Sequence, residues 1–166
     1  MKKVLSLLLL FSFLISCSSD KYENLKEHPI VGEWTLDYVS HELDIDASLD
    51  YHNIEDILYR AFEEEEKHIM SLGKLRVIFE EDGTFVTYVG GEFNGSGSYK
   101  IKKDRITMSD SESSEKFQFE LFFDQLDIVE DQTTYYKNSV IGGVDKNEWT
   151  RAIKRVLTIQ KYSRVR

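Results

Sequence analysis

An acidic stretch between residues 44 and 55 has the spacing of a calcium-binding loop. Oxygen-bearing side chains occupy the first, third, fifth, seventh and twelfth positions, where such loops carry ligands: Asp44, Asp46, Ser48, Asp50 and Glu55. The sixth position, where the sharp turn of such a loop wants glycine, holds Leu49. A polar loop leading into a helix, whose dipole favours acids near its start, accounts for the same residues. The pattern is incomplete, and we assign no metal and no other cofactor.

Residue types that often serve in catalysis are scattered along the chain. The histidines form no HxxxH or HExxH pair that would bind a catalytic zinc ion; they are His28, His41, His52 and His68. There is no Gly-x-Ser-x-Gly elbow. The glycine-rich stretch GGEFNGSG is typical of a hairpin turn, because no strand-to-helix pattern surrounds it. Since no acid–base constellation is visible, we expect a protein that is not an enzyme.

The only cysteine of the chain, Cys17, stands at the end of an apolar segment. A short basic start, Met1-Lys2-Lys3, precedes the uncharged run VLSLLLLFSFLIS. This run is too short to span a bilayer, which needs about 20 apolar residues. A basic start followed by a short apolar run is typical of a secretory signal. A lone cysteine has no intramolecular disulfide partner, and without a CxxC neighbour it is a poor zinc ligand.

The stretch LISC that ends at Cys17 resembles the lipobox of bacterial lipoprotein signals. The resemblance implies that residues 1–16 are a signal peptide and that the thiol of Cys17 carries acyl chains. Buried acyl chains, at about 0.8 kcal/mol per CH₂, would hold a soluble domain on a membrane. Ser18 stands where an aspartate would retain such a lipoprotein in the inner membrane. We therefore expect a lipid-anchored protein of the cell envelope, on the outer membrane and facing the periplasm or the cell surface; a plain secretory signal is the alternative.

Composition limits the size of the mature protein and its partners. Removing 16 of the 166 residues leaves 150, which is enough for one domain. Two of the 21 basic residues lie in the signal, so 19 bases face 30 acids and the net charge is near −11. This charge argues against nucleic-acid binding, which requires clustered Lys and Arg. Residues 17–29 are polar and contain the only proline, and we expect a tether there, with the folded domain spanning residues 30–166.

From Val31 onward the hydrophobic pattern mostly has the period of two that is typical of strands. In VGEWTLDYVS this period places Trp34, Leu36 and Tyr38 on one face. Further on, Asp-Gly at 82–83 joins two alternating runs, which is a strong hairpin signal. We expect other turns at 103–104 and 124–125. About eight short strands joined in this way predict a mainly β protein, an up-and-down antiparallel barrel closed by pairing its first strand with its last.

Residues 53–72 have a helical period instead of an alternating one. Apolar residues recur every three to four positions, opposite a charged face that includes the acidic run 63–66. Asn53 can cap the start of this helix and Gly73 can end it. The pattern predicts one amphipathic helix inserted between strands one and two, either as a lid over the barrel or as a plug in it. We expect a second short helix at residues 145–153.

Five short segments resemble the lipocalin-like domains of bacterial lipoproteins, which have a calycin-type β-barrel. These segments are VGEW, FEEDGTF, GSGSYKIKKDRI, LDIVED and VLTIQKY. The resemblance implies that Gly32 and Trp34 close the floor of the barrel, with Arg155 or Arg164 stacked on the tryptophan. One feature departs from the lipocalin pattern. The predicted helix of this chain follows strand one, as in fatty-acid-binding proteins, whereas lipocalins carry their helix late in the chain.

We expect seven aromatic residues to line the barrel interior, as core or around a cavity: Trp34, Tyr38, Phe79, Phe85, Tyr99, Phe117 and Phe119. Barrels of this size either are filled by side chains or hold one small ligand. The first hypothesis is therefore a lipid-anchored module that binds a small hydrophobic ligand in the envelope. The alternative is a filled barrel that acts as an interaction module for an envelope protein.

Overall fold

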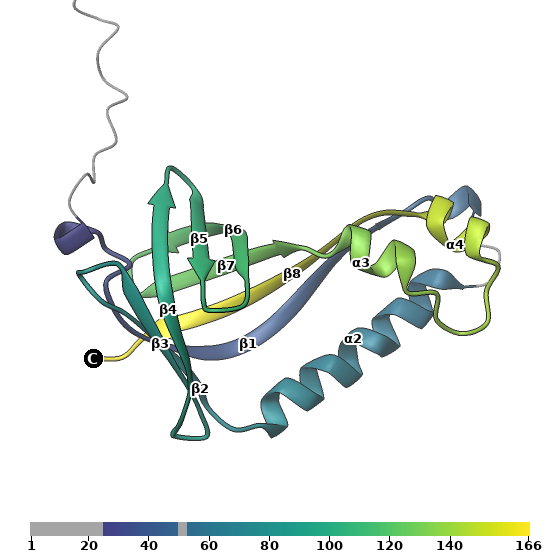
Figure 1. Cartoon of the computed structure of the whole chain (residues 1–166). Helices are drawn as coiled ribbons and strands as arrows, with labels where there is room; N and C mark the ends of the chain where they lie inside the picture. Colours follow the sequence, from purple (N-terminus) through teal and green to yellow (C-terminus); the bar gives the residue numbers. More distant parts are fainter. Residues whose placement is uncertain (1–24, 50–52) are drawn as a thin grey trace, which may run out of the picture.

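The structure is a computed structural model that describes residues 25–49 and 53–166. Eight antiparallel strands follow one another in sequence order, and β1 pairs with β8 to close a barrel (Figure 1). The strands are β1 (Gly32–Ile45), β2 (Leu75–Phe79), β3 (Thr84–Val89), β4 (Glu92–Lys102), β5 (Arg105–Ser109), β6 (Ser114–Phe122), β7 (Gln125–Asp131) and β8 (Ile153–Arg164). The predicted up-and-down barrel is confirmed.

Strands β1 and β8 form a long ribbon that joins the two ends of the molecule. Their pairing runs from Trp34 opposite Arg164 to Ile45 opposite Ile153. At the second of these ends the ribbon projects past the barrel and carries the helices (Figure 1). We call the end of the barrel that contains Trp34 and Arg164 the closed end, and the opposite end the open end.

A β-bulge in β1 changes which side chains face the interior. The register against β8 shifts between Leu36 and Tyr38. Trp34 and Leu36 are buried, but Tyr38 is 47% exposed, and Val39 takes the next inward position. The prediction that Tyr38 lines the interior is therefore wrong, because alternation does not continue through a bulge. The ring of Tyr38 lies on the outside, 5.8 Å from Nζ of Lys161.

The hairpin between β2 and β3 follows its sequence signal. Gly83 adopts a positive φ of 83°, which suits glycine in a tight turn. The carboxylate of Asp82 accepts hydrogen bonds from the backbone N–H of Thr84 at 2.9 Å and from its hydroxyl at 2.6 Å. The turn at 103–104 likewise joins β4 and β5 as expected.

The hairpin between β6 and β7 lies one residue earlier than its prediction at 124–125. Phe122 ends β6 and Gln125 begins β7, so Phe123 and Asp124 form the turn. Phe123 has a φ of 53° and is 85% exposed. A bulky residue is rare in this left-handed region, where Asn, Asp or Gly is usual. The alternation of Phe117, Phe119 and Leu121 therefore stops before this phenylalanine.

The predicted amphipathic helix is present as α2 (Ile54–Ser71), between β1 and β2. It ends as expected, because Gly73, with a φ of 94°, directly follows the C-cap residue Leu72. Its start differs from the prediction. Asn53 occupies the N-cap position in a left-handed conformation, and its side chain makes no capping hydrogen bond.

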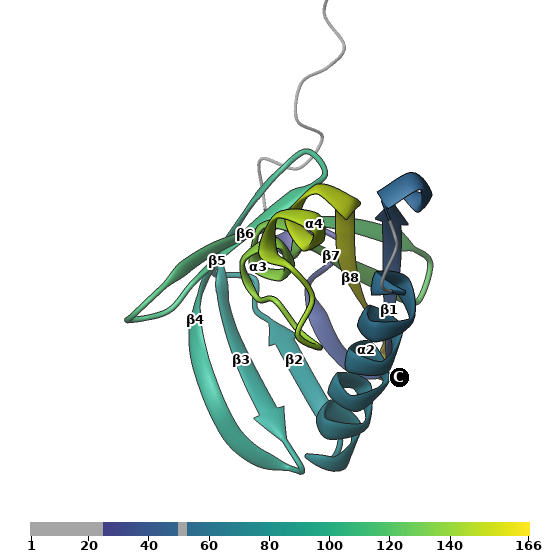
Figure 2. The ribbon, with the colours of Figure 1, turned by 90° about the vertical axis from the view of Figure 1, so that its right-hand side faces the viewer.

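A second hydrophobic core joins side chains of the helices with those of the β1–β8 ribbon; Figure 2 shows how these helices are arranged relative to the barrel. The expected second helix is α4 (Lys146–Ala152), capped by the Asp145 carboxylate. A helix that the sequence pattern did not predict, α3 (Thr133–Asn138), precedes it. Leu58 and Phe62 of α2 pack here with Tyr136 and Trp149, and the indole N–H of Trp149 donates to the carbonyl of Tyr136 at 2.6 Å. Helix α2 thus contributes Leu58 and Phe62 to this second core, while its Ile69 packs against the barrel core.

The folded region extends into the segment that we expected to be a tether at 17–29. Residues Leu25–Glu27 form a short 3₁₀ helix, η1, and Leu25 packs against the barrel core. His28 is only 6% exposed, and its ring lies 6.1 Å from that of Phe119. The packed chain therefore includes at least five residues before the expected boundary at Ile30. Cys17 and the predicted signal peptide lie outside the described residues.

Candidate functional site

Trp34 and Arg164 close one end of the barrel. The guanidinium carbon of Arg164 lies 4.4 Å from the centre of the Trp34 ring, within the range of a cation–π contact. The same guanidinium donates hydrogen bonds to the carbonyls of Val31, at 3.0 Å, and Pro29. Of the two arginines that the resemblance offered, Arg164 is the one on the tryptophan. Arg155 lines a groove on the outer face of the barrel.

The backbone around Trp34 is shaped to accept this arginine. The indole N–H of Trp34 donates to the carbonyl of Ile30 at 2.7 Å, which orients the ring and satisfies its only donor. Gly32 has a φ of 133°, and a Cβ there would lie 2.7 Å from Nη1 of Arg164. A glycine is therefore required at position 32, two residues before the tryptophan, for both conformation and space.

A cavity of about 430 Å³ occupies the barrel interior toward the open end. Its apolar lining comes from five strands: Leu75, Val77, Phe85, Met108, Phe117 and Ile128. Its polar lining consists of Thr87, Asn94, Asp110, Ser113, Glu115, Glu130, Gln160 and Tyr162. Among the described residues, none from α2 lines this cavity, and Ile69 of the helix packs against the barrel core.

The aromatic residues expected inside the barrel divide into two groups, Tyr38 excepted. Phe85 and Phe117 line the cavity. The others are buried in the barrel core: Trp34, Phe79, Tyr99 and Phe119. The hydroxyl of Tyr99 donates to the carbonyl of Glu80 at 2.8 Å, and burial raises the pKa of this phenol to about 12. These packed rings fill the barrel between the closed end and the cavity.

Three carboxylates line the cavity near its opening. Asp110 has a structural task, because its carboxylate accepts from the backbone N–H groups of Glu112 and Ser113, both at 2.7 Å. These bonds shape the loop between β5 and β6 and lower the pKa of Asp110. Glu130 is half-buried, and its pKa is raised by burial and by the negative charges of Glu115 and Glu65. The opening of the cavity is thus a region of negative potential.

Glu65, in the acidic run 63–66, contacts other side chains of the protein as well as solvent. Its Oε2 accepts from the hydroxyl of Tyr136 at 2.9 Å and lies 3.6 Å from Nε2 of His41. The His41 ring stacks on Phe62, with 4.2 Å between ring centres. The nearby imidazole of His41 and the hydrogen bond from Tyr136 lower the pKa of Glu65 against the opposing effect of burial. This cluster fastens α2 to β1 and α3 beside the barrel.

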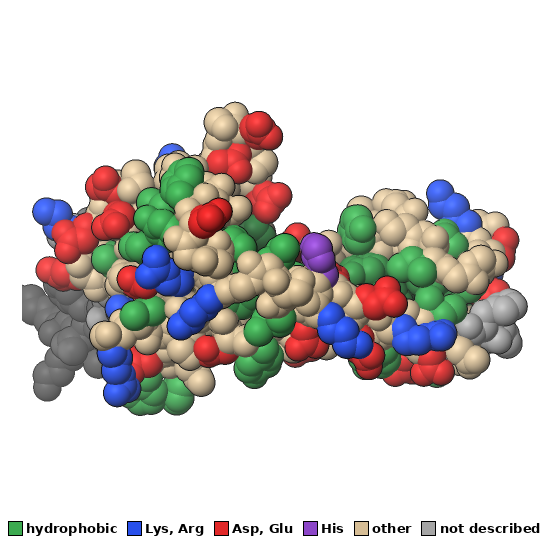
Figure 3. Space-filling view, turned by 90° about the horizontal axis from the view of Figure 1, so that it is seen from below, with side chains coloured by type: hydrophobic (Ala, Val, Ile, Leu, Met, Phe, Trp, Pro, Cys, Tyr) green, Lys and Arg blue, Asp and Glu red, His purple; other side chains and the backbone are tan. Residues whose placement is uncertain are grey.

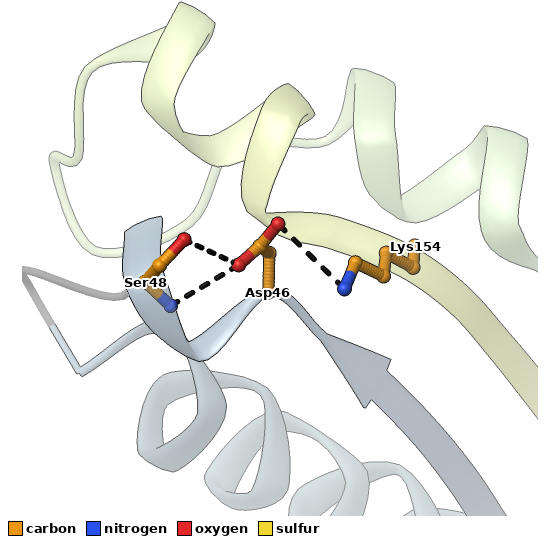
Figure 4. A network of polar contacts seen from close by, with 3 residues as sticks. All are labelled: Asp46, Ser48 and Lys154. Carbon is orange, nitrogen blue, oxygen red and sulfur yellow. Dashed lines mark hydrogen bonds and ion pairs between the residues drawn. The ribbon is translucent and has the colours of Figure 1, made fainter.

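The calcium-like residues do not gather into a metal site in the described part of the chain. Asp44 lies in β1, and Asp46 precedes a 3₁₀ turn, η2 (Ala47–Leu49). The Asp46 carboxylate accepts from the backbone N–H of Ser48 at 3.1 Å and from its hydroxyl at 2.6 Å, and lies 3.6 Å from Nζ of Lys154 (Figure 4). The first two bonds lower its pKa more than the lysine does. Asp50 lies outside the described residues.

Two acids mark the open end of the cavity and were not predicted from the sequence, Glu115 and Glu130. A signal for both was present. Glu115 is two residues before Phe117, and Glu130 is two residues after Ile128, so each shares a strand face with a cavity residue. An acid on the inward face of an otherwise apolar alternation is the pattern that would have identified them.

A scan against protein-family models finds no match to this chain, and a search of curated proteins finds no similar sequence. Of the helices that the structure describes, none combines the length and apolar character needed to cross a membrane. What the fold and the site define is an eight-stranded barrel, closed at one end, with an acidic-rimmed cavity at the other.

Proposed function

We propose that this protein is a non-enzymatic binding module, anchored by lipid in the bacterial envelope, whose barrel holds one small ligand with a substantial apolar part. The cavity carries this proposal. Its volume of about 430 Å³ lies in the range of small-molecule sites, and six apolar side chains form much of its wall. The Gly32–Trp34–Arg164 floor supports kinship with the lipocalin-like, calycin-type domains.

The alternative function, a filled barrel that docks an envelope protein, receives less support. A filled barrel would bring side chains from opposite strands into contact along its length. Near the closed end Phe79 and Tyr99 pack with ring centres 5.0 Å apart. Toward the open end, side chains of β2, β5 and β7 surround the cavity instead.

Ligand binding can be tested with a neutral fluorescent probe such as N-phenylnaphthylamine, whose emission rises in an apolar site. We expect saturable binding and displacement by decanol. Met108→Trp, which fills the cavity, should abolish this signal, whereas Val129→Trp, on the outer groove, should retain it. Circular dichroism melting of both variants checks that they fold. No saturable binding by the parent protein would refute the proposal.

The lipid anchor is a separate part of the proposal and rests on Cys17. The described chain enters the barrel at its closed end, where Arg164 donates a hydrogen bond to the carbonyl of Pro29, and Cys17 lies outside the described residues. Radiolabelled palmitate should be incorporated into the parent chain and into Ser18→Ala. It should not be incorporated into Cys17→Ala. Labelling of Cys17→Ala would contradict acylation at this residue.

A further inference from the structure

The carboxylates at the cavity opening indicate the charge of the ligand. We infer that the ligand is an amphipathic cation, with an apolar body between the strands and a protonated amine directed at Glu130. This inference rests on the proposed binding function. Glu115, exposed at the same rim, contributes a second negative charge.

The described residues that line the cavity include acidic side chains and no basic ones. Among its described lining residues there are three carboxylates and no Lys, Arg or His. The outer face of the same strands differs, because Asp127 of β7 pairs with Lys161 of β8 at 3.2 Å, and Arg155 lies in the same outer groove. Figure 3 shows acidic and basic side chains interspersed over the outer face of the molecule that it presents. The acidic composition of the chain therefore does not by itself explain a lining without cations.

Glu130 lies among groups that do not neutralise it. Burial and the charges of Glu115 on β6 and Glu65 on α2 all act against its ionised form, opposed by a hydrogen bond from Gln132. The basic residue that lies close to Glu65 is His41, with 3.6 Å between its Nε2 and Oε2 of Glu65, so His41 pairs with Glu65. A cation at the cavity opening would relieve this repulsion, and an anion would add to it.

A buried hydroxyl next to Glu130 points to a hydrogen-bonding group on the ligand. Thr158 lies directly opposite Glu130 in the β7–β8 pairing, so both side chains project to the same, inner face of the sheet. Thr158 is 4% exposed, and its hydroxyl oxygen has no hydrogen-bond partner among the described residues. An unsatisfied buried hydroxyl is costly. Thr158 does not itself line the cavity, but it shares the inner face of the sheet with Glu130, so a protonated amine at that carboxylate brings a donor to the same face.

The apolar wall sets the other half of the ligand. Ile128 is two residues before Glu130 on the same face of β7, and Val77 and Phe85 lie deeper on β2 and β3. An alkyl or aryl body placed among these side chains would have its charged group at the acidic rim. Each CH₂ buried there contributes about 0.8 kcal/mol, whatever the charge of the head group.

Three ligands that differ only in the head group separate the charge inference from the proposed function. Binding of protonated decylamine, decanol and decanoate is measured by calorimetry at pH 7 on protein carrying Cys17→Ala, so that no attached acyl chain competes for the cavity. We expect decylamine to bind about tenfold or more tighter than decanol, and decanoate to bind most weakly. Glu130→Gln should remove most of the preference for the amine while leaving decanol affinity unchanged. Asp127→Asn, on the outer face of the same strand, should keep the preference.

Each outcome decides one of the two proposals. Equal affinities for the three compounds, tighter binding of decanoate, or an amine preference that survives in Glu130→Gln would overturn the cation inference while leaving a binding barrel. Absence of binding by all three, together with the neutral probe, would overturn the proposed function as well. Thr158→Val adds a further readout, because loss of its hydroxyl should weaken decylamine binding more than decanol binding.

Discussion

The guanidinium of Arg164, near the end of the chain, lies over the indole of Trp34, near the start of the fold, with 4.4 Å between the guanidinium carbon and the ring centre. Two backbone carbonyls hold the arginine in place. The contact joins the first strand to the last at the point where the barrel closes. The barrel floor and the closure of the sheet are therefore one structural feature.

Removing this arginine should destabilise the whole barrel. Arg164→Ala loses a cation–π contact and two charge-assisted hydrogen bonds, and we expect the free energy of unfolding to fall by about 2 to 4 kcal/mol. Arg155→Ala, on the outer face, should cost less than about 1 kcal/mol. Urea denaturation of both variants measures the difference. Similar losses in the two would show that Arg164 has no special role.

Gly97 should tolerate no side chain. A Cβ at this position of β4 would lie 2.2 Å from the carbonyl oxygen of Ser109 and 2.8 Å from the ring of Phe85. We expect Gly97→Ala to cost about 1 to 3 kcal/mol or more through overpacking. Gly95→Ala on the same strand is the matched control, because its nearest contact would be an ordinary 3.6 Å from Thr87. Thermal melting of the two proteins tests this, and equal melting temperatures would argue against the close approach.

Phe123 occupies a turn position that suits a different residue. With a φ of 53° and 85% exposure, it has backbone strain and little burial to offset it. Phe123→Asn should raise the free energy of unfolding by about 0.5 to 1 kcal/mol. Phe122→Asn, at the end of β6, should have no stabilising effect. Chemical denaturation provides the comparison, and a destabilised Phe123→Asn would mean that this ring makes contacts that matter.

Glu130 should make stability depend on pH. Its pKa is raised in the folded state by burial and by Glu115 and Glu65, so the unfolded chain releases this proton more readily. The folded state is then penalised as the pH rises from the ordinary glutamate range, about 4 to 5, through the raised pKa. Glu130→Gln should therefore melt higher than the parent at pH 7, with the gap shrinking toward pH 4. Glu120→Gln, exposed on β6, should follow the parent curve, and a Glu130→Gln curve parallel to the parent would count against a raised pKa.

Prediction from the sequence succeeds where the signal is local. Alternating apolar residues and an Asp82-Gly83 turn are properties of a few neighbouring residues, and they define the strands and hairpins. The spacing of apolar residues in 53–72 likewise defines α2. The prediction of seven inward aromatic residues follows from the same alternation. This prediction fails for Tyr38, because the bulge there depends on pairing with β8, some 120 residues later in the chain. The alternation does not extend to Phe123, because the turn between β6 and β7 interrupts the strand there.

The sequence by itself determined the class of fold and its order of strands, because these depend on composition, period and short motifs; the use of Cys17 as a lipid anchor stays a prediction. Only the tertiary structure decided that Arg164 rather than Arg155 stacks on Trp34. It also decided that the interior is partly hollow and that Glu130 faces the hollow. These depend on how distant strands meet, since side-chain volumes must sum around a closed barrel and no local pattern records that sum.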